Sequence, residues 1–135
     1  MFAGCNKEGI PDLVACKGTV TWKGKPVEGA LVGFLPKDAN GRGAFGMTDA
    51  QGKFNTTTLH TDDGIMPGEY FITVIKRTVT RGSISPTGEQ ITKTYFIPQI
   101  YAEKNTSGLS ATISSKGTKD LLFELVGEIE NRPTR

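Results

Sequence analysis

Residues 18–34 read Gly18-Thr-Val-Thr-Trp-Lys-Gly-Lys-Pro-Val-Glu-Gly-Ala-Leu-Val-Gly-Phe34, two alternating runs joined by a turn. In an extended chain every second side chain lies on the same face. In and just before the first run, one face therefore carries Val14, Cys16, Gly18, Val20 and Trp22. The second run places Ala30, Val32 and Phe34 in one phase. Because Gly24 can supply a positive φ and Pro26 withholds a backbone donor, this stretch predicts a hairpin or a corner between two sheets.

The composition predicts an all-β protein. The 135 residues include 17 Gly and 7 Pro, and no long segment shows helical periodicity. A chain of this length suits one domain with a buried core. We therefore expect many short strands separated by turns.

Charge and hydropathy limit the classes of partner that we expect for this protein. Sixteen basic and fourteen acidic residues give a net charge of +2, and the basic residues are scattered along the chain. Nucleic-acid binding usually needs a concentrated basic patch, so the pattern does not favour nucleic acid as a partner. No run of apolar residues is long enough for a membrane-spanning helix, and we expect any membrane link to be an anchor.

The two cysteines have different contexts, although a disulfide between them is possible in principle. Cys16 shares the phase of Val20, which predicts a buried core thiol. The residues Phe2-Ala-Gly-Cys5 resemble the end of a bacterial lipoprotein signal, in which small residues precede a cysteine that is lipidated after cleavage. We interpret residues 1–12 as this signal remnant and a polar tether, with the lipid on Cys5. The alternative is a chance run with an ordinary thiol.

The middle and the end of the chain contain further strand patterns. Residues 44–59 predict a second hairpin, and residues 109–126 predict a closing hairpin around a turn at 115–120. Residues 68–77 predict a strand with apolar side chains on both faces. Such a strand is either central and covered on both sides, or it contributes Phe71 to a contact surface. The polar residues 127–135 are expected to form a flexible tail.

One loop carries residues that could take part in chemistry. It contains His60, the only histidine, and the neighbouring carboxylates of Asp62 and Asp63. A Ca²⁺ ion needs several oxygen ligands and a zinc site needs three or four ligands, and the further ligands are not visible in the sequence. We expect ordinary loop chemistry with an exposed histidine, no bound metal and no cofactor.

Residues 78–100 are less regular and contain Ser-Pro and Thr-Gly turn pairs. A connection of this length is often functional, so a binding surface is expected here first. The candidate contact residues are aromatic: Tyr95, Phe96, Tyr101 and, from the preceding strand, Phe71. The preferred interpretation of Tyr95, Phe96 and Tyr101 is that their rings seal one end of the domain, with a contact role as the alternative.

Several segments in order carry a family resemblance: Gly18–Ala30 with Val32 and Phe34, Thr48–Phe54, Met66–Tyr70 with Ile72 and Val74, Leu109–Ile113, and Phe123–Leu125. Over roughly residues 14–126 the chain resembles the small transthyretin-like, or carboxypeptidase-regulatory-like, β-sandwich lipoproteins of planctomycete-type bacteria. The resemblance implies a seven- or eight-stranded Greek-key β-sandwich, transthyretin-like and immunoglobulin-like in architecture, over residues 13–126. It also implies export and lipid anchoring, with no established activity.

These observations lead to ranked expectations of function. The first is a non-enzymatic, lipid-anchored extracytoplasmic module in the periplasm or at the cell surface, which binds an envelope protein or polysaccharide. The alternative is a carbohydrate-binding module that uses the aromatic rings of Trp22, Tyr95, Phe96 or Tyr101. A transthyretin-like hydrolase ranks last, because the resemblance associates that activity with several histidines and a terminal Tyr-Arg-Gly-Ser, whereas this sequence has one histidine and reads Asn131-Arg-Pro-Thr-Arg135. No catalytic residue is assigned.

Overall fold

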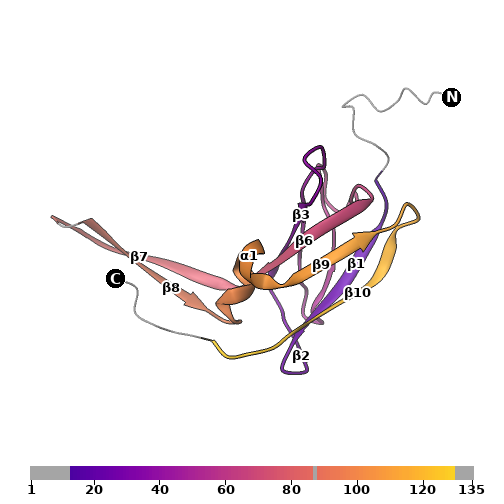
Figure 1. The fold of residues 1–135 in the computed structure, drawn as a ribbon. Helices are drawn as coiled ribbons and strands as arrows, with labels where there is room; N and C mark the ends of the chain where they lie inside the picture. Colours follow the sequence, from indigo (N-terminus) through magenta and orange to yellow (C-terminus); the bar gives the residue numbers. More distant parts are fainter. Residues whose placement is uncertain (1–12, 87, 130–135) are drawn as a thin grey trace.

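The computed structural model describes residues 13–86 and 88–129 and confirms an all-β sandwich (Figure 1). Eight strands of the described chain form its two sheets. The first sheet contains β1 (Cys16–Trp22), β2 (Lys25–Pro26), β5 (Lys53–Asn55) and β10 (Thr118–Leu125). The second has the order β4 (Ala44–Met47), β3 (Leu31–Pro36), β6 (Gly68–Ile75) and β9 (Leu109–Ile113).

The quoted stretch forms both structures that its pattern allowed. Lys23 and Gly24 have positive φ values of 56° and 78°, and this tight turn pairs β1 with the short β2. The chain then crosses over, because Ala30 leads into β3 of the second sheet. The pattern of the second run did not decide which phase faces inward, and the structure shows that it is the phase of Ala30, Val32 and Phe34, which are all buried.

Strand β1 occupies the middle of the first sheet. It pairs in parallel with β10 along one edge, and its other edge is shared by β5 and β2. Gly18 lies opposite Phe54 in this ladder, and a Cβ at that position would lie 2.6 Å from the Phe54 ring. The glycine therefore lets an aromatic side chain lie directly against the β1 backbone.

In each of the two predicted hairpins, the two strands do not pair with each other as neighbours in one sheet. Strand β4 pairs with β3 and β5 pairs with β1, so the segment 44–59 links two different sheets. In the same way β9 pairs with β6 and β10 pairs with β1. Period-two alternation identifies strands with one buried face, but two consecutive strands can bury those faces against each other from opposite sheets. Within 44–59 one predicted cross-strand pair does form, the antiparallel bridge in which Phe45 and Thr57 exchange backbone hydrogen bonds of 3.0 and 2.7 Å, but the strands β4 and β5 have other partners.

The core lies between the two sheets and is built around aromatic rings. Phe34 contacts Phe54 and Tyr70 at centroid distances of 6.0 and 5.9 Å, and Phe54 stacks on Phe123 at 6.2 Å. Cys16 is 2% exposed, which confirms the prediction of a core thiol. No buried side-chain nitrogen or oxygen in the described part of the chain lacks a hydrogen-bond partner.

The segment 78–100 departs most from expectation. Instead of an irregular connection it forms a two-stranded antiparallel sheet, β7 (Arg77–Ser85) and β8 (Gly88–Tyr95). Figure 1 shows this hairpin extending away from the sandwich, and we call residues 77–95 the arm. The alternation of Thr with Arg, Val, Ile and Lys favours extended chain on both sides of the turn, and the last pair of the ladder before the turn is Ser85 with Gly88.

A short helical connection returns the chain from the arm to the second sheet. It contains a 3₁₀ turn at Gln99–Ala102 and α1 (Lys104–Ser107). Ser107 is buried and its hydroxyl donates to the carbonyl of Ile72 over 2.6 Å, which fixes the connection against β6. None of the described helices is both long and apolar enough to cross a membrane.

The chain just beyond β10 is held in place. The hydroxyl of Tyr101 accepts from Val126 N at 2.9 Å, and Trp22 Nε1 donates to the carbonyl of Gly127 over 2.9 Å. The Lys23 ammonium lies 2.8 Å from the Glu128 carboxylate. Gly127 and Glu128, at the start of the predicted tail, therefore contact the end of β1 and the turn that follows it. The rest of that predicted tail, from residue 130, lies outside the described residues, as does Cys5.

Candidate functional site

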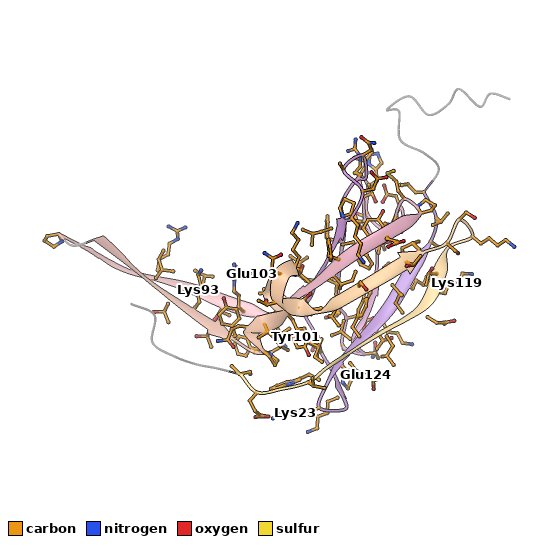
Figure 2. The ribbon with its side chains drawn as sticks, in the orientation of Figure 1. Lys23, Lys93, Tyr101, Glu103, Lys119 and Glu124 are labelled. Atoms are coloured by element: carbon orange, nitrogen blue, oxygen red, sulfur yellow. The ribbon has the colours of Figure 1, made fainter. Side chains whose placement is uncertain are left out.

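The predicted contact residues do not form one row. Tyr101 is 4% exposed and both bonds of its hydroxyl go to the backbone of Val126, so this ring seals the end of the sandwich. Tyr101 therefore does not present a binding surface; its polar tip is used internally. Figure 2 shows it at the base of the arm, on the segment that returns to α1.

The other three aromatic rings lie on separate surfaces. Phe71 of β6 is half-buried beneath two lysine ammonium groups, those of Lys37 at 4.9 Å and Lys104 at 5.6 Å from the ring centroid. Tyr95 is half-buried on the arm and accepts a hydrogen bond of 3.2 Å from Arg77 Nη1. Phe96 is 44% exposed and marks the point where the arm joins the sandwich. Of the predicted set, Phe96 therefore offers the largest open ring.

A groove of about 450 Å³ lies where the arm meets the turn between β1 and β2. Its walls come from both segments, which are distant in sequence: Trp22, Lys23, Lys25, Pro26, Val27, Lys76, Phe96 and Ile97. We call this the basal groove. It combines an apolar floor with three lysines, and two of these lie over aromatic rings, Lys23 at 4.8 Å from Trp22 and Lys76 at 5.8 Å from Phe96. Such a surface suits a ligand that has both a flat apolar face and a negative charge.

The arm itself has two different faces. The register places Arg77 opposite Tyr95, Val79 opposite Lys93, and Arg81 opposite Ile91. Because the side-chain period of a strand is two, these six residues share one face, on which each cross-strand pair joins a cation to an apolar or aromatic side chain. We call this the cationic face. The positions between them on β7 and β8, such as Thr78 opposite Thr94, carry threonine on the other face.

The exposed apolar groups of the arm are substantial. Val79 is 49% exposed and Ile91 is 47% exposed, and they lie on the cationic face. Neither strand of the arm pairs with a third strand in the described part of the chain. An isolated two-stranded ribbon is marginally stable in water, and open strand edges are templates for pairing with another chain.

A second hollow, of about 610 Å³, lies on the outer face of the first sheet. Its rim mixes both charges, with Lys17, Lys53 and Lys119 beside Asp49 and Asp120. Asp49 accepts hydrogen bonds from the backbone nitrogens of Gln51 and Lys53, each at 2.9 Å, so its carboxylate shapes a turn. Because positive and negative side chains both line this hollow, its charge does not favour either anionic or cationic ligands.

The loop with the only histidine is a structural turn. The Asp63 carboxylate accepts from the backbone nitrogens of Thr58 at 2.7 Å, Leu59 at 3.0 Å and His60 at 2.8 Å. Partial burial acts to raise the pKa of Asp63, but these hydrogen bonds and the nearby His60 hold that pKa below its usual range. His60 is exposed. Within residues 13–86 and 88–129, no three His, Cys, Asp or Glu side chains gather into a group that could hold a metal ion.

The sequence reasoning missed most of this surface. It did not single out Arg77, Val79, Ile91 or Lys93, and it did not bring the turn residue Lys25 near Phe96. A signal for the arm was present, because cation and apolar residues alternate with threonine on both sides of the Ser-Pro and Thr-Gly pairs. No local pattern could have indicated the basal groove, since it depends on how the arm leaves β6.

Comparison with known proteins does not assign the chain to a family. No protein-family model and no curated protein matches the sequence. Two solved structures are similar: a 9R-lipoxygenase from Cyanothece PCC8801, with a TM-score of 0.42 and 14% identity over 86% of this chain, and chlorocatechol 1,2-dioxygenase from Pseudomonas putida, with 0.40 and 15% over 88%. The chain spans 16% of the lipoxygenase and 62% of the dioxygenase. At these TM-scores neither structure carries an argument about this chain.

Proposed function

We propose that this protein is a non-enzymatic binding module of the cell envelope, anchored through a lipid on Cys5 and presenting its arm to a protein partner. The observation that carries the proposal is the arm, which combines open strand edges with an exposed cationic and apolar face. A face of this kind is typical of an interaction surface. A partner that covers it would remove its apolar groups from water and would form hydrogen bonds with its open strand edges.

The position of the arm suits a tethered module. Val14, near the start of the described chain, pairs with Ile65 just before β6 begins, whereas the arm follows the other end of β6. The eight residues of β6 at about 3.3 Å each separate the two ends by roughly 25 Å. An anchor on the N-terminal side would therefore hold the sandwich by one end and direct the arm away from the membrane (Figure 1).

The reactive groups support a binding role over a catalytic one. Burial raises the pKa of the Cys16 thiol to about 11, although a hydrogen bond with Thr56 lowers it in part. A buried, protonated thiol is a poor nucleophile at neutral pH. His60 is exposed on its loop, and its backbone nitrogen helps to hold the Asp63 carboxylate. Neither group faces the arm or the basal groove.

Two measurements test the proposal. Labelling the protein in its native host with a lipid precursor should place the label on Cys5, and Cys5→Ala should remove both the label and the membrane association. Photocrosslinkers introduced at Val79 and, as a matched exposed control on the sandwich, at Leu122 should then be compared in intact cells. A partner captured from position 79 alone supports the module. Unlabelled Cys5, or equal capture from both positions, contradicts it.

A carbohydrate-binding role is the second candidate, and the basal groove favours it. Trp22 and Phe96 come together there with three lysines, which suits an acidic sugar more than a neutral one. Affinity electrophoresis in gels that contain polygalacturonate or neutral cellulose derivatives tests this role. Retardation by the acidic polymer that is abolished in Phe96→Ala would favour it. Equal mobility in both gels would remove it.

A further inference from the structure

The open edges of the arm can be assigned residue by residue. Phe96 N donates to the carbonyl of Lys76 over 2.8 Å, and these residues lie directly opposite in the register of the arm. Hydrogen-bonded and non-hydrogen-bonded pairs alternate along an antiparallel ladder. The next pair, Arg77 with Tyr95, is therefore non-hydrogen-bonded, and so is Val79 with Lys93. At these positions the backbone N–H and C=O groups point away from the partner strand.

The outward-pointing backbone groups belong to the residues of the cationic face. A chain that pairs with either edge would therefore place its side chains beside a regular series of cations and apolar groups. Residues 77–95 contain Arg77, Arg81 and Lys93 but one acidic residue, Glu89. The ion pairs of Lys23 with Glu128 and of Lys37 with Glu69 lie on the sandwich, and neither Arg77 nor Lys93 belongs to them.

We propose that the arm binds an extended, acidic segment of its partner protein as a third β-strand. Backbone hydrogen bonds at Val79 or Lys93 would supply the pairing. On the side of the segment that meets the cationic face, acidic and apolar residues would alternate two positions apart, so that aspartate or glutamate lies beside Arg77 on one edge or Lys93 on the other. Apolar residues of the same segment would cover Val79 and Ile91. This inference rests on the proposed protein-binding function and names the chemistry of the partner.

Two other occupants fit the arm less well. A second copy pairing edge to edge would bring a strand with the same excess of positive charge, so it offers no charge complementarity to the arm. An anionic lipid surface would satisfy the charges but has no regular series of backbone donors and acceptors to pair with the outward N–H and C=O groups. An acidic strand satisfies both sets of groups.

The test uses the full chain and a defined probe, the octapeptide Glu-Thr-Val-Thr-Glu-Thr-Val-Thr, in which glutamate and valine alternate on one face and threonine occupies the other. We expect it to bind with chemical-shift changes centred on the arm amides, and to bind more weakly at high salt. A matched peptide with lysine in place of glutamate should not bind. Lys93→Glu should weaken binding by about tenfold or more, whereas Lys119→Glu, an exposed site on β10 far from the arm in Figure 2, should not.

Proline substitutions separate backbone pairing from simple charge attraction. Val79→Pro and Lys93→Pro each remove one outward N–H without removing a bond of the arm, because those N–H groups do not face the partner strand. One of the two variants should abolish binding, which identifies the edge used. Arm amide signals check that the hairpin persists, and Lys93→Glu gives an independent readout if a proline variant unfolds it.

Several outcomes would overturn the inference. These are no binding of the acidic peptide at about 1 mM, unchanged binding in both proline variants with the hairpin intact, arm-dependent binding to phosphatidylglycerol vesicles in place of the peptide, or dimers formed through the arm. Each of these could occur while Cys5 is lipidated and position 79 captures a partner in cells. Failure of the acidic-strand inference is therefore distinguishable from failure of the proposed function.

Discussion

The sandwich and the arm are built from the same local pattern and differ in what covers it. In β3 the alternate residues Val32 and Phe34 are buried against the opposite sheet. In the arm the alternate residues Val79 and Ile91 remain about half exposed. Alternation thus specifies an extended chain with two unlike faces, whereas stability depends on whether another element covers one of them. The difference predicts where substitutions change folding and where they change binding alone.

The largest contrast should come from paired truncations in the two regions. Phe34→Ala removes a ring that is 1% exposed and packs against Phe54 and Tyr70, so we expect a decrease of about 3–5 kcal/mol in the free energy of unfolding. Ile91→Ala on the arm should change it by less than about 0.5 kcal/mol. Urea titration of both variants measures the difference. Comparable decreases would show that the arm folds as part of the core.

A smaller effect is expected from the buried thiol at alkaline pH. The fold raises the pKa of Cys16 from 9.0 to about 11, so between these values the unfolded chain loses a proton that the folded chain keeps. This contribution to stability is fully present below pH 9 and is lost as pH rises towards 11. At pH 10.5 the loss should be about 2 kcal/mol.

The measurement compares urea midpoints at pH 8 and pH 10.5 for the parent chain and for Cys16→Ala, both in a Cys5→Ser background. The parent should lose more stability than the variant, since the variant has no thiol to ionise on unfolding. Parallel losses in the two chains would mean that Cys16 ionises as readily in the fold as in the unfolded chain.

The Asp63 loop should show a weaker effect of opposite sign. Asp63→Ala removes three backbone hydrogen bonds to a carboxylate at the surface, for which we expect a loss of about 1 kcal/mol at neutral pH. Because the folded pKa lies below the ordinary value of 3.8, this contribution is present above that value and disappears as pH falls through the folded pKa. Thermal unfolding of both chains at pH 7 and at acid pH should converge at the lower pH. A constant gap would contradict the assigned role of the carboxylate.

The strands of the sandwich were predictable because their pattern is local. Cys16 and Val20 are buried as their phase indicated, and the turn formed at Gly24, where a positive φ was expected. Pairing was not predictable in the same way. Two alternating runs on either side of a turn, such as 109–113 and 118–125, look the same whether they pair with each other or face each other across the core.

The candidate site was predicted only in its general location. The segment 78–100 was expected to carry a binding surface, and Phe96 is exposed there as a groove residue. Tyr101 is buried at the end of the sandwich, as the sealing interpretation predicted, and its hydroxyl bonds both the carbonyl and the nitrogen of Val126. Whether the cations of the arm share one face with its apolar residues depends on the register that places Val79 opposite Lys93. That register depends on the turn and on the bulge, which the sequence pattern does not specify.

The smallest expected change in stability separates the two regions most directly. Val79→Thr on the arm and Leu122→Thr on β10 both replace exposed apolar side chains by a residue that suits a strand, so each should alter the free energy of unfolding by less than about 0.5 kcal/mol. Only the arm variant should weaken binding of the acidic octapeptide, by about fourfold, because a hydroxyl replaces a methyl group that the peptide would cover. Isothermal titration of both variants measures this. If both variants bind the peptide with equal affinity, Val79 plays no part in recognition. A partner strand would then not explain why this valine is exposed.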